Sequence, residues 1–481
     1  MLAFMMQPGS PHVVVVGGGF AGLAAAECLL QTGRAGVTLI EPTGRCGGIV
    51  ATERRDGWLI ERSADSFLAA RPEAVALAER LGLTDELIGV APVARRALVL
   101  RKGRPEPVPA GFRLLAPGSL RGILASPLLS PSGRLRVVAE RFVPRRSGAV
   151  VDESLEQFVV RRLGREAFER LVQPLAAGIW TADPARLSMA AACPDFFAME
   201  ARDGSLWAGE RRRLSSVAAA PAAGARYGQF LTVASGMDML PRRLADRLAS
   251  AGVRRITGTA AGVSRQPGGG WQVDLHAGAE RDATASAIRA DAVILAVPAP
   301  VAASLLHGVD ARLSADVAAI EHAGSAVVSL GFSRHDVAHP LDAAGLVVPR
   351  CEGRRVLAVS FSSSKFPGRA PADAVLLRAF VGGALDPEAA HLDDVRLVAL
   401  VQADLREMLG VGGTPRIVQV DRWHGAMPQY TLGHVERVAR IRTAVAAHRG
   451  LALAGAAYEG VGIPQVIASG QAAAAAVSGA M

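Results

Sequence analysis

Lysine is nearly absent from this chain of 481 residues. Lys102 and Lys365 are the only two, so the net charge of +9 comes almost entirely from arginine. Aromatic residues are also scarce, at 5%, and no basic run is interleaved with them as single-strand nucleic-acid binders require. We therefore expect no nucleic-acid partner. Contact with acidic lipids or with a substrate that carries carboxylates stays open as an interpretation of the basic charge, to which arginine-rich codon usage contributes.

Cysteine is equally sparse. Its four positions, Cys28, Cys46, Cys193 and Cys351, lie far apart and form no CxxC motif or Cys/His cluster. This spacing argues against a zinc site, an iron–sulfur site and a disulfide framework. We expect no metal site and four ordinary core thiols in a reducing compartment.

Long apolar runs are missing as well. The first eleven residues have neither the basic nor the apolar region of a signal peptide. No window approaches the roughly 18 to 20 uninterrupted apolar residues that a spanning helix needs. The expectation is a cytoplasmic protein, either free or attached peripherally to the inner face of the cell membrane.

The order of the local patterns predicts more than one packed unit, as the length does. Nucleotide-type strand and helix patterns occur at both ends and in the middle, which predicts one discontinuous Rossmann-like domain from residues 1–90, 228–305 and 420–481. Residues 91–227 show helical patterns punctuated by arginine and are expected to form a helical insertion. Residues 306–419 are mostly strand-like and predict an antiparallel substrate-binding sheet. The predicted fold class combines α/β with α+β.

The strongest local motif follows the first expected strand, residues 12–16. It comprises Gly17, Gly18, Gly19, Phe20, Ala21 and Gly22. Glycines in the pattern GxGxxG permit a tight turn, close approach of a pyrophosphate, and close packing of the helix that follows. The second expected strand, residues 37–40, ends at Glu41, where a carboxylate can accept ribose hydroxyls. The spacing predicts a dinucleotide site, with an ordinary glycine turn as the alternative.

Two other glycine-rich turns indicate which dinucleotide binds. Just after Glu41 and Pro42, Arg45 precedes Cys46, Gly47 and Gly48. The paired glycines let the backbone pass close to a bulky ligand, and Arg45 can face a phosphate or the edge of a flavin. A surface turn with a solvated arginine is the alternative.

The other turn, residues 455–464, precedes the last expected helix, and Pro464 suits that helix's first turn. A helix N-terminus aimed at a flavin would stabilise the anionic reduced ring. The alternative is a helix start packed in the core.

The combined motifs resemble those of the FAD-dependent amine oxidase superfamily and, within it, of the HemY-type porphyrinogen oxidases. Residues 174–180, 427–434 and 458–470 are among the matching stretches, and the blocks 178–180 and 427–434 narrow the resemblance to the porphyrinogen branch. The resemblance implies FAD contacts at the glycine motif, Glu41, Pro42, Arg45, Gly48, Ser63, Ala64, Asp65, Ser66, Val461, Gly462 and Ile463. It implies substrate contacts at Gly178, Ile179 and Trp180 on one wall, and at Met427, Gln429 and Tyr430 on another. Plain core packing is the alternative for the apolar members.

The sequence departs from the family pattern at three places. Ser63-Ala64 stands where Gly-Pro is usual, which predicts a looser or differently shaped turn over the flavin. Ala97 occupies the place of a substrate-facing arginine, so Arg95 and Arg96 become the candidates for holding a substrate carboxylate. Thr181-Ala182 replaces small glycines and would narrow the pocket.

The resemblance implies a six-electron oxidation of protoporphyrinogen IX to protoporphyrin IX in haem biosynthesis. Hydride would pass to flavin N5 in three two-electron rounds, with O2 as acceptor. Because the flavin carries the chemistry, no catalytic acid or base is predicted. His434 is the histidine most worth testing, although a hydrogen-bonded structural role is the alternative.

Other functions stay open at this point. Oxidation of coproporphyrinogen III to coproporphyrin III is one alternative, and its substrate has four carboxylates where protoporphyrinogen has two. Another FAD amine oxidase or a desaturase is a second alternative. A nucleotide-binding structural or regulatory protein without turnover is a third. A homodimer also stays open.

Basic and apolar residues alternate in one stretch of the expected helical insertion. Its arginines are Arg134, Arg136, Arg141, Arg145 and Arg146, and its apolar residues are Leu135, Val137, Val138, Phe142 and Val143. A peripheral membrane contact at this stretch is a hypothesis that the pattern permits. The alternative is an ordinary amphipathic helix whose basic face is solvated.

Overall fold

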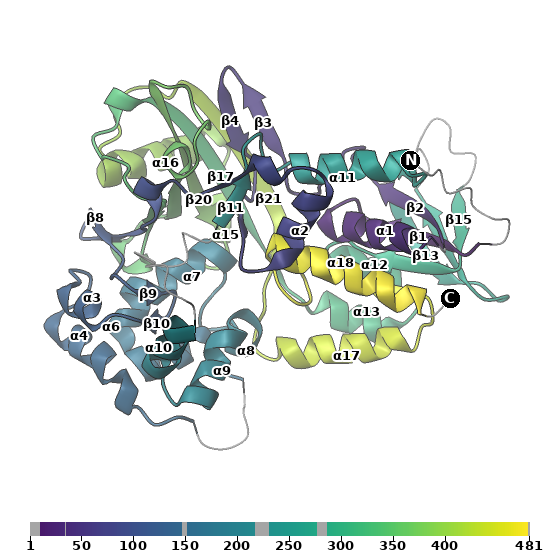
Figure 1. Cartoon of the computed structure of the whole chain (residues 1–481), viewed down its shortest axis with the longest axis horizontal. Helices are drawn as coiled ribbons and strands as arrows, with labels where there is room; N and C mark the ends of the chain where they lie inside the picture. The colour runs from purple at the N-terminus through teal and green to yellow at the C-terminus, as the bar shows by residue number, and fades with distance from the viewer. Residues whose placement is uncertain (1–9, 34, 147–151, 217–229, 277–285, 480–481) are drawn as a thin grey trace.

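The computed structural model describes residues 10–33, 35–146, 152–216, 230–276 and 286–479. It contains a parallel sheet with helices, a large mixed sheet, and a group of helices that adjoins both (Figure 1). This architecture confirms the predicted fold class.

The parallel sheet has five strands in the order β12-β2-β1-β16-β22. Their bounds are β1 (His12–Val16), β2 (Gly36–Glu41), β12 (Arg254–Thr257), β16 (Ala292–Leu295) and β22 (Leu451–Leu453). Val13 and Val15 point to one face of the sheet, whereas Val14 and Val16 point to the other. Because successive side chains of a strand alternate between faces, this unbroken apolar run is suited to a sheet that is covered on both sides.

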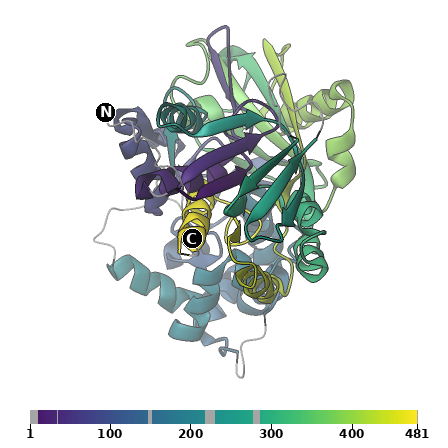
Figure 2. The ribbon, with the colours of Figure 1, turned by 90° about the vertical axis from the view of Figure 1, so that its right-hand side faces the viewer.

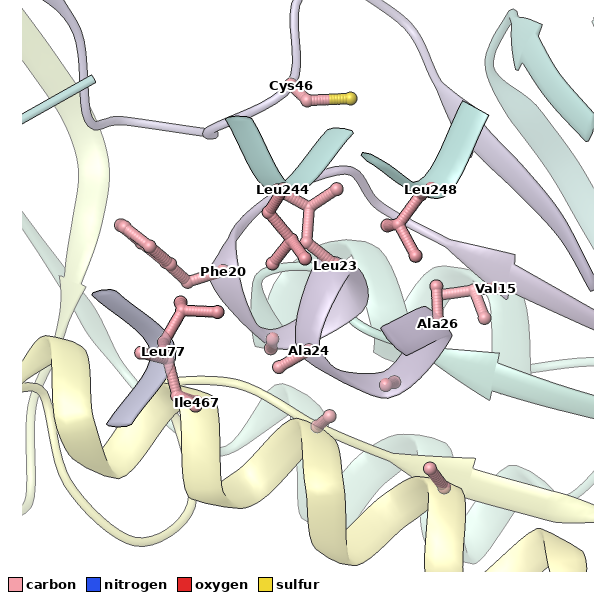
Figure 3. Close-up of a cluster of buried hydrophobic side chains, with 14 of the residues drawn as sticks. Val15, Phe20, Leu23, Ala24, Ala26, Cys46, Leu77, Leu244, Leu248 and Ile467 are labelled. Carbon is pink, nitrogen blue, oxygen red and sulfur yellow. The ribbon is translucent and has the colours of Figure 1, made fainter. Parts of the chain in front are cut away.

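Different elements cover the two faces. One face packs against helices α1 (Phe20–Thr32), α2 (Pro72–Arg80), α11 (Met239–Ser250) and α18 (Ile463–Ser478). Figure 3 shows the middle of this core, where Leu244 of α11 and Ile467 of α18 lie near α1, the helix that contains Leu23. The other face packs against β13 (Ala260–Arg265), β14 (Trp271–Leu275), β15 (Ala287–Ala290), α12 (Ala299–Leu306), α13 (Ala311–Ala318) and α17 (His434–Ala446).

The first and last of these helices cross in direct backbone contact. In Figures 1 and 2 the purple α1 and the yellow α18 lie side by side. A Cβ built on Gly470 would lie 2.0 Å from the carbonyl oxygen of Ala21. Only glycine therefore permits this approach, which brings the two ends of the chain together as the motifs predicted.

The large sheet has seven strands in the order β21-β17-β20-β19-β18-β7-β8, and only the β18–β7 pair is parallel. Their bounds are β7 (Leu98–Arg101), β8 (Arg104–Pro107), β17 (His322–Ser333), β18 (Gly345–Val347), β19 (Val356–Phe361), β20 (Ala374–Gly382) and β21 (Ile417–Pro428). One face packs against the long helix α16 (Asp394–Leu409). The other face turns toward the parallel-sheet unit and the helical group.

The strand pairing bears on the expected division into domains, which itself stays a prediction. β7 and β8 lie within residues 91–227, the expected helical insertion, yet they hydrogen-bond into the large sheet. β21 begins at Ile417 and spans the expected boundary at residue 420. Four smaller sheets complete the described sheets. One is the group β13-β14-β15 already named. The others are β3 (Thr52–Arg55) with β4 (Trp58–Glu61); β5 (Phe67–Leu68), β11 (Phe230–Val233) and β6 (Leu87–Gly89); and β9 (Phe112–Arg113) with β10 (Ala116–Pro117).

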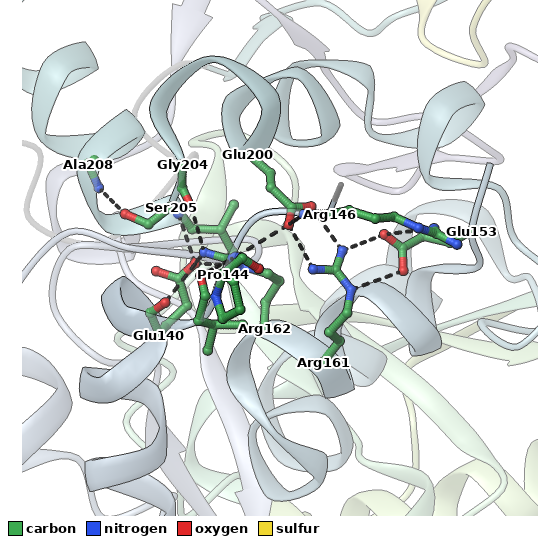
Figure 4. Close-up of polar contacts among 12 residues, drawn as sticks. Glu140, Pro144, Arg146, Glu153, Arg161, Arg162, Glu200, Gly204, Ser205 and Ala208 are labelled. Atoms are coloured by element: carbon green, nitrogen blue, oxygen red, sulfur yellow. Dashed lines mark hydrogen bonds and ion pairs between the residues drawn. The ribbon is translucent and has the colours of Figure 1, made fainter. Parts of the chain in front are cut away.

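The helical group is organised around buried ion pairs. Its helices include α3 (Leu120–Ala125), α4 (Pro131–Val138), α5 (Leu155–Leu163), α7 (Gln173–Trp180), α8 (Met189–Ala192), α9 (Pro194–Asp203) and α10 (Leu206–Ser216). Arg162 and Glu140 are both fully buried, and Arg162 Nε donates to Glu140 Oε1 at 2.7 Å. Glu200 accepts from Arg161 Nη1 at 2.7 Å (Figure 4). Removing one partner would leave a buried charge unpaired, so these residues fix the helices in one arrangement.

The cysteines differ in one respect from the expectation. Cys46 and Cys193 are buried and Cys28 is half-buried, but Cys351 is exposed. The prediction of a core thiol was wrong for Cys351 because it lies in a short 3₁₀ turn between two strands of the large sheet. Among the described residues, no helix combines the length and the apolarity needed to cross a membrane.

The crossing of α1 and α18 gives a direct test. Replacing Gly470→Ala should lower the free energy of unfolding by about 1–3 kcal/mol, because the new methyl group overlaps the Ala21 carbonyl. Urea denaturation measures this change. Gly479→Ala is the matched control, since its Cβ would meet ordinary contacts at 3.6 Å. Equal stability of the two variants would contradict the tight crossing.

Candidate FAD and substrate site

The predicted nucleotide-binding residues gather at one edge of the parallel sheet. Gly17 follows β1, Glu41 ends β2, and Ala296 follows β16. The turn that leads into α18 begins just after β22. These are the carboxyl ends of parallel strands, where ligands bind in open α/β sheets.

The glycines of the first turn have different roles. A Cβ on Gly17 would lie 2.3 Å from the Ala296 carbonyl oxygen, and one on Gly22 would lie 1.8 Å from that of Gly17. These two glycines allow the helix to pack on the strands. A Cβ on Gly19, in contrast, would meet only the Cα of Gly48, at 4.0 Å. A Cβ on Gly48 would lie 3.3 Å from the Cα of Gly19, so these two backbones lie close together. The side of Gly19 where a Cβ would stand is nearly open, and this space, bordered by Gly48, is called the slot below.

The start of α1 is electrostatically prepared for an anion. Its N-cap, Gly19, makes no side-chain capping bond, and the first turn contains no acidic residue. Free N–H groups and the helix dipole favour negative charge at such an end. The N-cap of α18, Gly462, has the same two properties. The slot and the helix end fit a pyrophosphate.

Glu41 is buried and links the second strand to the glycine turn. Its carboxylate accepts the Gly18 N–H at 2.9 Å, and the N–H and hydroxyl of Thr43 at 2.9 and 2.7 Å. Pro42 follows it at the surface. The predicted ribose acceptor thus lies directly beside the slot.

Arg45 makes hydrogen bonds within its own loop, and its contact with FAD stays a prediction. Its guanidinium donates to the carbonyl oxygens of Val50 at 2.8 Å, Gly48 at 2.6 Å and Cys46 at 3.3 Å. Arg45 therefore shapes its own loop. That loop lies on the glycine turn, because the Gly47 N–H donates to the Gly18 carbonyl at 2.8 Å.

The turn from Ser63 to Ser66 connects this loop to the large sheet. The Ser63 hydroxyl donates to the Ile49 carbonyl at 2.6 Å, and Arg378 donates to the Ser63 carbonyl. These bonds anchor the Ser63-Ala64 turn, which the departure from Gly-Pro predicted to be looser. Asp65 forms a buried ion pair with Lys365 at 2.9 Å.

Sequence reasoning missed Lys365 and Arg378. Arg378 carries no distinguishing local motif, but Lys365 has a usable signal as one of two lysines in an arginine-rich chain.

The predicted substrate walls come together on one face of the large sheet. A Cβ on Gly178 would meet Val347 and Ala358 of the sheet at 3.8 and 4.0 Å. Ile179 and Val461 pack against the apolar cluster that contains Trp180 and Tyr430, and Phe380 of β20 joins them. Residues from three distant segments thus belong to one apolar cluster.

Tyr430 and His434 tie this cluster to the C-terminal glycine turn. Their rings stack with centroids 4.1 Å apart. The Tyr430 hydroxyl donates to the Ala456 carbonyl at 2.5 Å, and His434 Nε2 contacts the Tyr458 carbonyl at 3.4 Å, which makes Nε2 the protonated nitrogen. Burial lowers the pKa of His434 to about 4. A neutral, hydrogen-bonded structural role is therefore the better interpretation of His434.

Gln429 and Met427 lie at the other end of this wall. Gln429 Nε2 donates to the carbonyl oxygens of Trp180 at 3.3 Å and Met427 at 3.1 Å. Gln429 also lines a cavity of about 370 Å³ together with Gly324 and Gly383. Thr181 lies beside that cavity, since its carbonyl accepts the Ala384 N–H at 2.8 Å.

The two arginines expected to hold a substrate carboxylate do not belong to the apolar cluster that unites the predicted substrate walls. Arg95 and Arg96 are both exposed, and Arg96 forms an ion pair with Asp342. Ala97, which follows them, is buried. Binding of a substrate carboxylate by Arg95 or Arg96 stays a prediction.

Comparison with known proteins gives the family. The model of the flavin-containing amine oxidoreductases matches residues 20–478. The chain belongs to this family. The coproporphyrinogen III oxidase of Bacillus subtilis (strain 168) is 32% identical over 97% of this chain and 98% of its own length. The chloroplastic protoporphyrinogen oxidase of Nicotiana tabacum is 29% identical over 94% of this chain and 83% of its own.

A solved structure agrees with this assignment. It is that of a provisionally assigned protoporphyrinogen oxidase from Exiguobacterium sp. 255-15, with a TM-score of 0.84 and 30% identity. The match covers 98% of this chain and 99% of that one. The resemblance expected from the sequence is confirmed, and FAD is the cofactor of this flavoenzyme. The slot beside Gly19 and the two uncapped helix N-termini fit FAD; the individual contacts stay predictions.

The slot yields a second test. Gly19→Ala should weaken FAD binding at least about tenfold, because a methyl group would occupy the space beside the pyrophosphate. The unfolding free energy of the FAD-free protein should change by no more than about 1 kcal/mol, as for a change of N-cap residue. Flavin fluorescence titration and urea denaturation measure the two quantities.

Gly22→Ala provides the contrast, since its Cβ overlaps the Gly17 carbonyl and should reduce stability directly. Full FAD affinity in Gly19→Ala would rule out the slot as the pyrophosphate site.

Proposed function

We propose that this protein oxidises coproporphyrinogen III to coproporphyrin III. The observation that carries the proposal is the similarity to the B. subtilis coproporphyrinogen III oxidase over nearly the full length of both chains. The tobacco protoporphyrinogen oxidase is less similar and is matched over less of its length. The comparisons thus favour the coproporphyrinogen alternative over protoporphyrinogen IX, which the sequence alone put first. The arginine-rich composition agrees with a substrate that has four carboxylates.

The chain contributes a surface for a large, flat ring. Ile179, Phe380 and Val461 belong to the apolar cluster that the two predicted walls share. Such a surface orients an apolar macrocycle and excludes water from the reacting carbon. The stacked Tyr430 and His434 hold the turn that precedes Val461. When bound, FAD supplies the two-electron acceptor chemistry, and we propose O2 as the final acceptor for the six electrons.

Parallel assays test the substrate. The purified FAD-loaded protein should oxidise coproporphyrinogen III with a kcat/KM at least about tenfold above that for protoporphyrinogen IX, because only the former offers four carboxylates to the basic chain. Porphyrin fluorescence under air measures both rates. A preference for protoporphyrinogen IX would reverse the assignment, and turnover of neither would remove the proposed function.

We also propose that the helical group contacts anionic lipid. On α4 and the 3₁₀ turn after it, Leu135 and Phe142 are 65% and 77% exposed. Arg141 lies over the Phe142 ring at 5.2 Å. Only part of the stretch is free for such a contact, since Val137 is buried and Arg136 donates to the carbonyls of Arg161 and Arg162. Exposed apolar residues among arginines suit an anionic membrane surface.

Vesicle flotation tests this contact. The protein should float with phosphatidylglycerol vesicles at low salt, and Leu135→Ser with Phe142→Ser should reduce the bound fraction several-fold, because apolar insertion is lost. Val395→Ser is the matched control, since Val395 is 80% exposed on α16, outside the helical group. Binding that both variants retain, or no binding by the unmodified protein, would contradict the contact.

A further inference from the structure

A buried group of charges lies behind the turn formed by Ser63 to Ser66. Lys365 Nζ contacts the two Asp65 carboxylate oxygens at 2.9 and 3.1 Å, and Arg378 Nη1 lies 3.4 Å from one of them. The side chains of Lys365 and Arg378 are 11% and 1% exposed. One carboxylate thus faces two buried cations.

The neighbouring ion pair does not supply the missing negative charge. Arg369 is also buried and lies 3.8 Å from Glu61. Burial raises the pKa of Glu61, which disfavours its charged form. Burial acts in the same direction on Asp65, but Lys365 and Arg378 outweigh it and lower the pKa of that carboxyl. Three cations therefore share two carboxylates, of which only Asp65 is held firmly ionised.

An excess of buried positive charge is costly unless an anion lies nearby. Arg378 Nε is itself buried and has no hydrogen-bond partner among the described residues. The packing also holds the lysine in place, because Lys365 Nζ lies 5.6 and 5.0 Å from the ring centroids of Phe230 and Phe366. The cluster is thus rigid and incompletely neutralised.

Contacts place the cluster between the dinucleotide slot and the apolar wall. Gly48, which lies close to Gly19 and borders the slot, precedes Ile49, whose carbonyl accepts the Ser63 hydroxyl. The Ser63 carbonyl accepts from Arg378. On the other side, the Arg378 guanidinium lies 5.5 Å from the ring centroid of Phe380, which belongs to the apolar wall. The cluster is therefore linked by direct contacts to both the loop that borders the slot and the apolar wall.

We propose that Lys365 and Arg378 form an electrostatic element that stabilises the negative charge of reduced FAD and so raises its reduction potential. The inference rests on the FAD site of the proposed function and goes beyond it by assigning a role to residues outside the predicted contacts. Fixed positive charge near a flavin favours its anionic reduced form, and such charges act strongly where water is excluded. Direct binding of a substrate carboxylate is disfavoured, because Lys365 Nζ already contacts Asp65 and Ser66.

Lys365→Met tests the element, and Lys102→Met is the matched control. Lys102 is the other lysine of the chain and lies exposed in the β7–β8 hairpin. The holoprotein is titrated with dithionite beside a reference dye to obtain the FAD midpoint potential. It is titrated with sulfite, which adds to the flavin and leaves it negatively charged, to obtain a dissociation constant. No porphyrinogen is present, so the result is independent of the substrate assignment.

We expect Lys365→Met to weaken sulfite binding about tenfold and to favour oxidised FAD by the same factor, which corresponds to about 30 mV for a two-electron couple. Asp65→Asn removes a negative charge from the same place and should shift both quantities in the opposite direction. Lys102→Met should change neither.

The opposite signs separate this element from a merely structural cluster. Lys365→Met with bound FAD and an unchanged potential would overturn the proposal. Shifts of Lys365→Met and Asp65→Asn in the same direction would overturn it as well. If Lys365→Met does not retain FAD, Asp65→Asn decides alone, and an unchanged or lowered potential in that variant counts against the element.

Discussion

The backbone contact between α1 and α18 is the constraint on which the site depends. The helix α1 follows the first glycine turn, and α18 follows the Gly455–Ile463 turn. These two turns lie more than 400 residues apart in the sequence. Because Gly470 has no side chain, α18 can approach the Ala21 carbonyl closely. The uncapped N-termini of both helices then belong to one packed unit. A bulkier residue at the crossing would separate the two halves of the cofactor site.

A second set of contacts fixes the large sheet against this unit. Arg62 Nε donates to Asp421 of β21 at 2.6 Å, and Trp423 of the same strand donates to the Arg62 carbonyl at 3.0 Å. Arg378 of β20 lies on the same face of the sheet and donates to the Ser63 carbonyl. Polar residues on this face therefore bind the nucleotide unit, whereas Phe380 and Ala358 on the same face contribute to the apolar wall.

Local patterns were sufficient to predict the glycine turn, the helices α1 and α18, and the buried strands β1 and β2. Spacing alone determines these features, because a tight turn or an amphipathic helix is specified within about fifteen residues. The interactions of the arginines and of Asp65 could not be predicted in this way. Asp65 and Lys365 are 300 residues apart, and Arg96 meets Asp342 across 246. Such pairs depend on sheet topology, which no local spacing specifies.

The departures from the family pattern also show that local sequence does not specify long-range contacts. A Ser63-Ala64 turn predicts flexibility only if nothing replaces the rigidity of proline. Here the Ser63 hydroxyl bonds to Ile49 and the Ser63 carbonyl to Arg378, so hydrogen bonds supply what the ring would have supplied. Hydrogen-bond geometry also accounts for the presence of lysine rather than arginine at position 365. An ammonium group is a compact charge with three donors, and its position satisfies two oxygens of Asp65 and the hydroxyl of Ser66. The planar guanidinium of arginine would have to satisfy the same three acceptors in one plane while lying between Phe230 and Phe366. That geometric demand explains why a chain that uses arginine almost everywhere retains a lysine at this position.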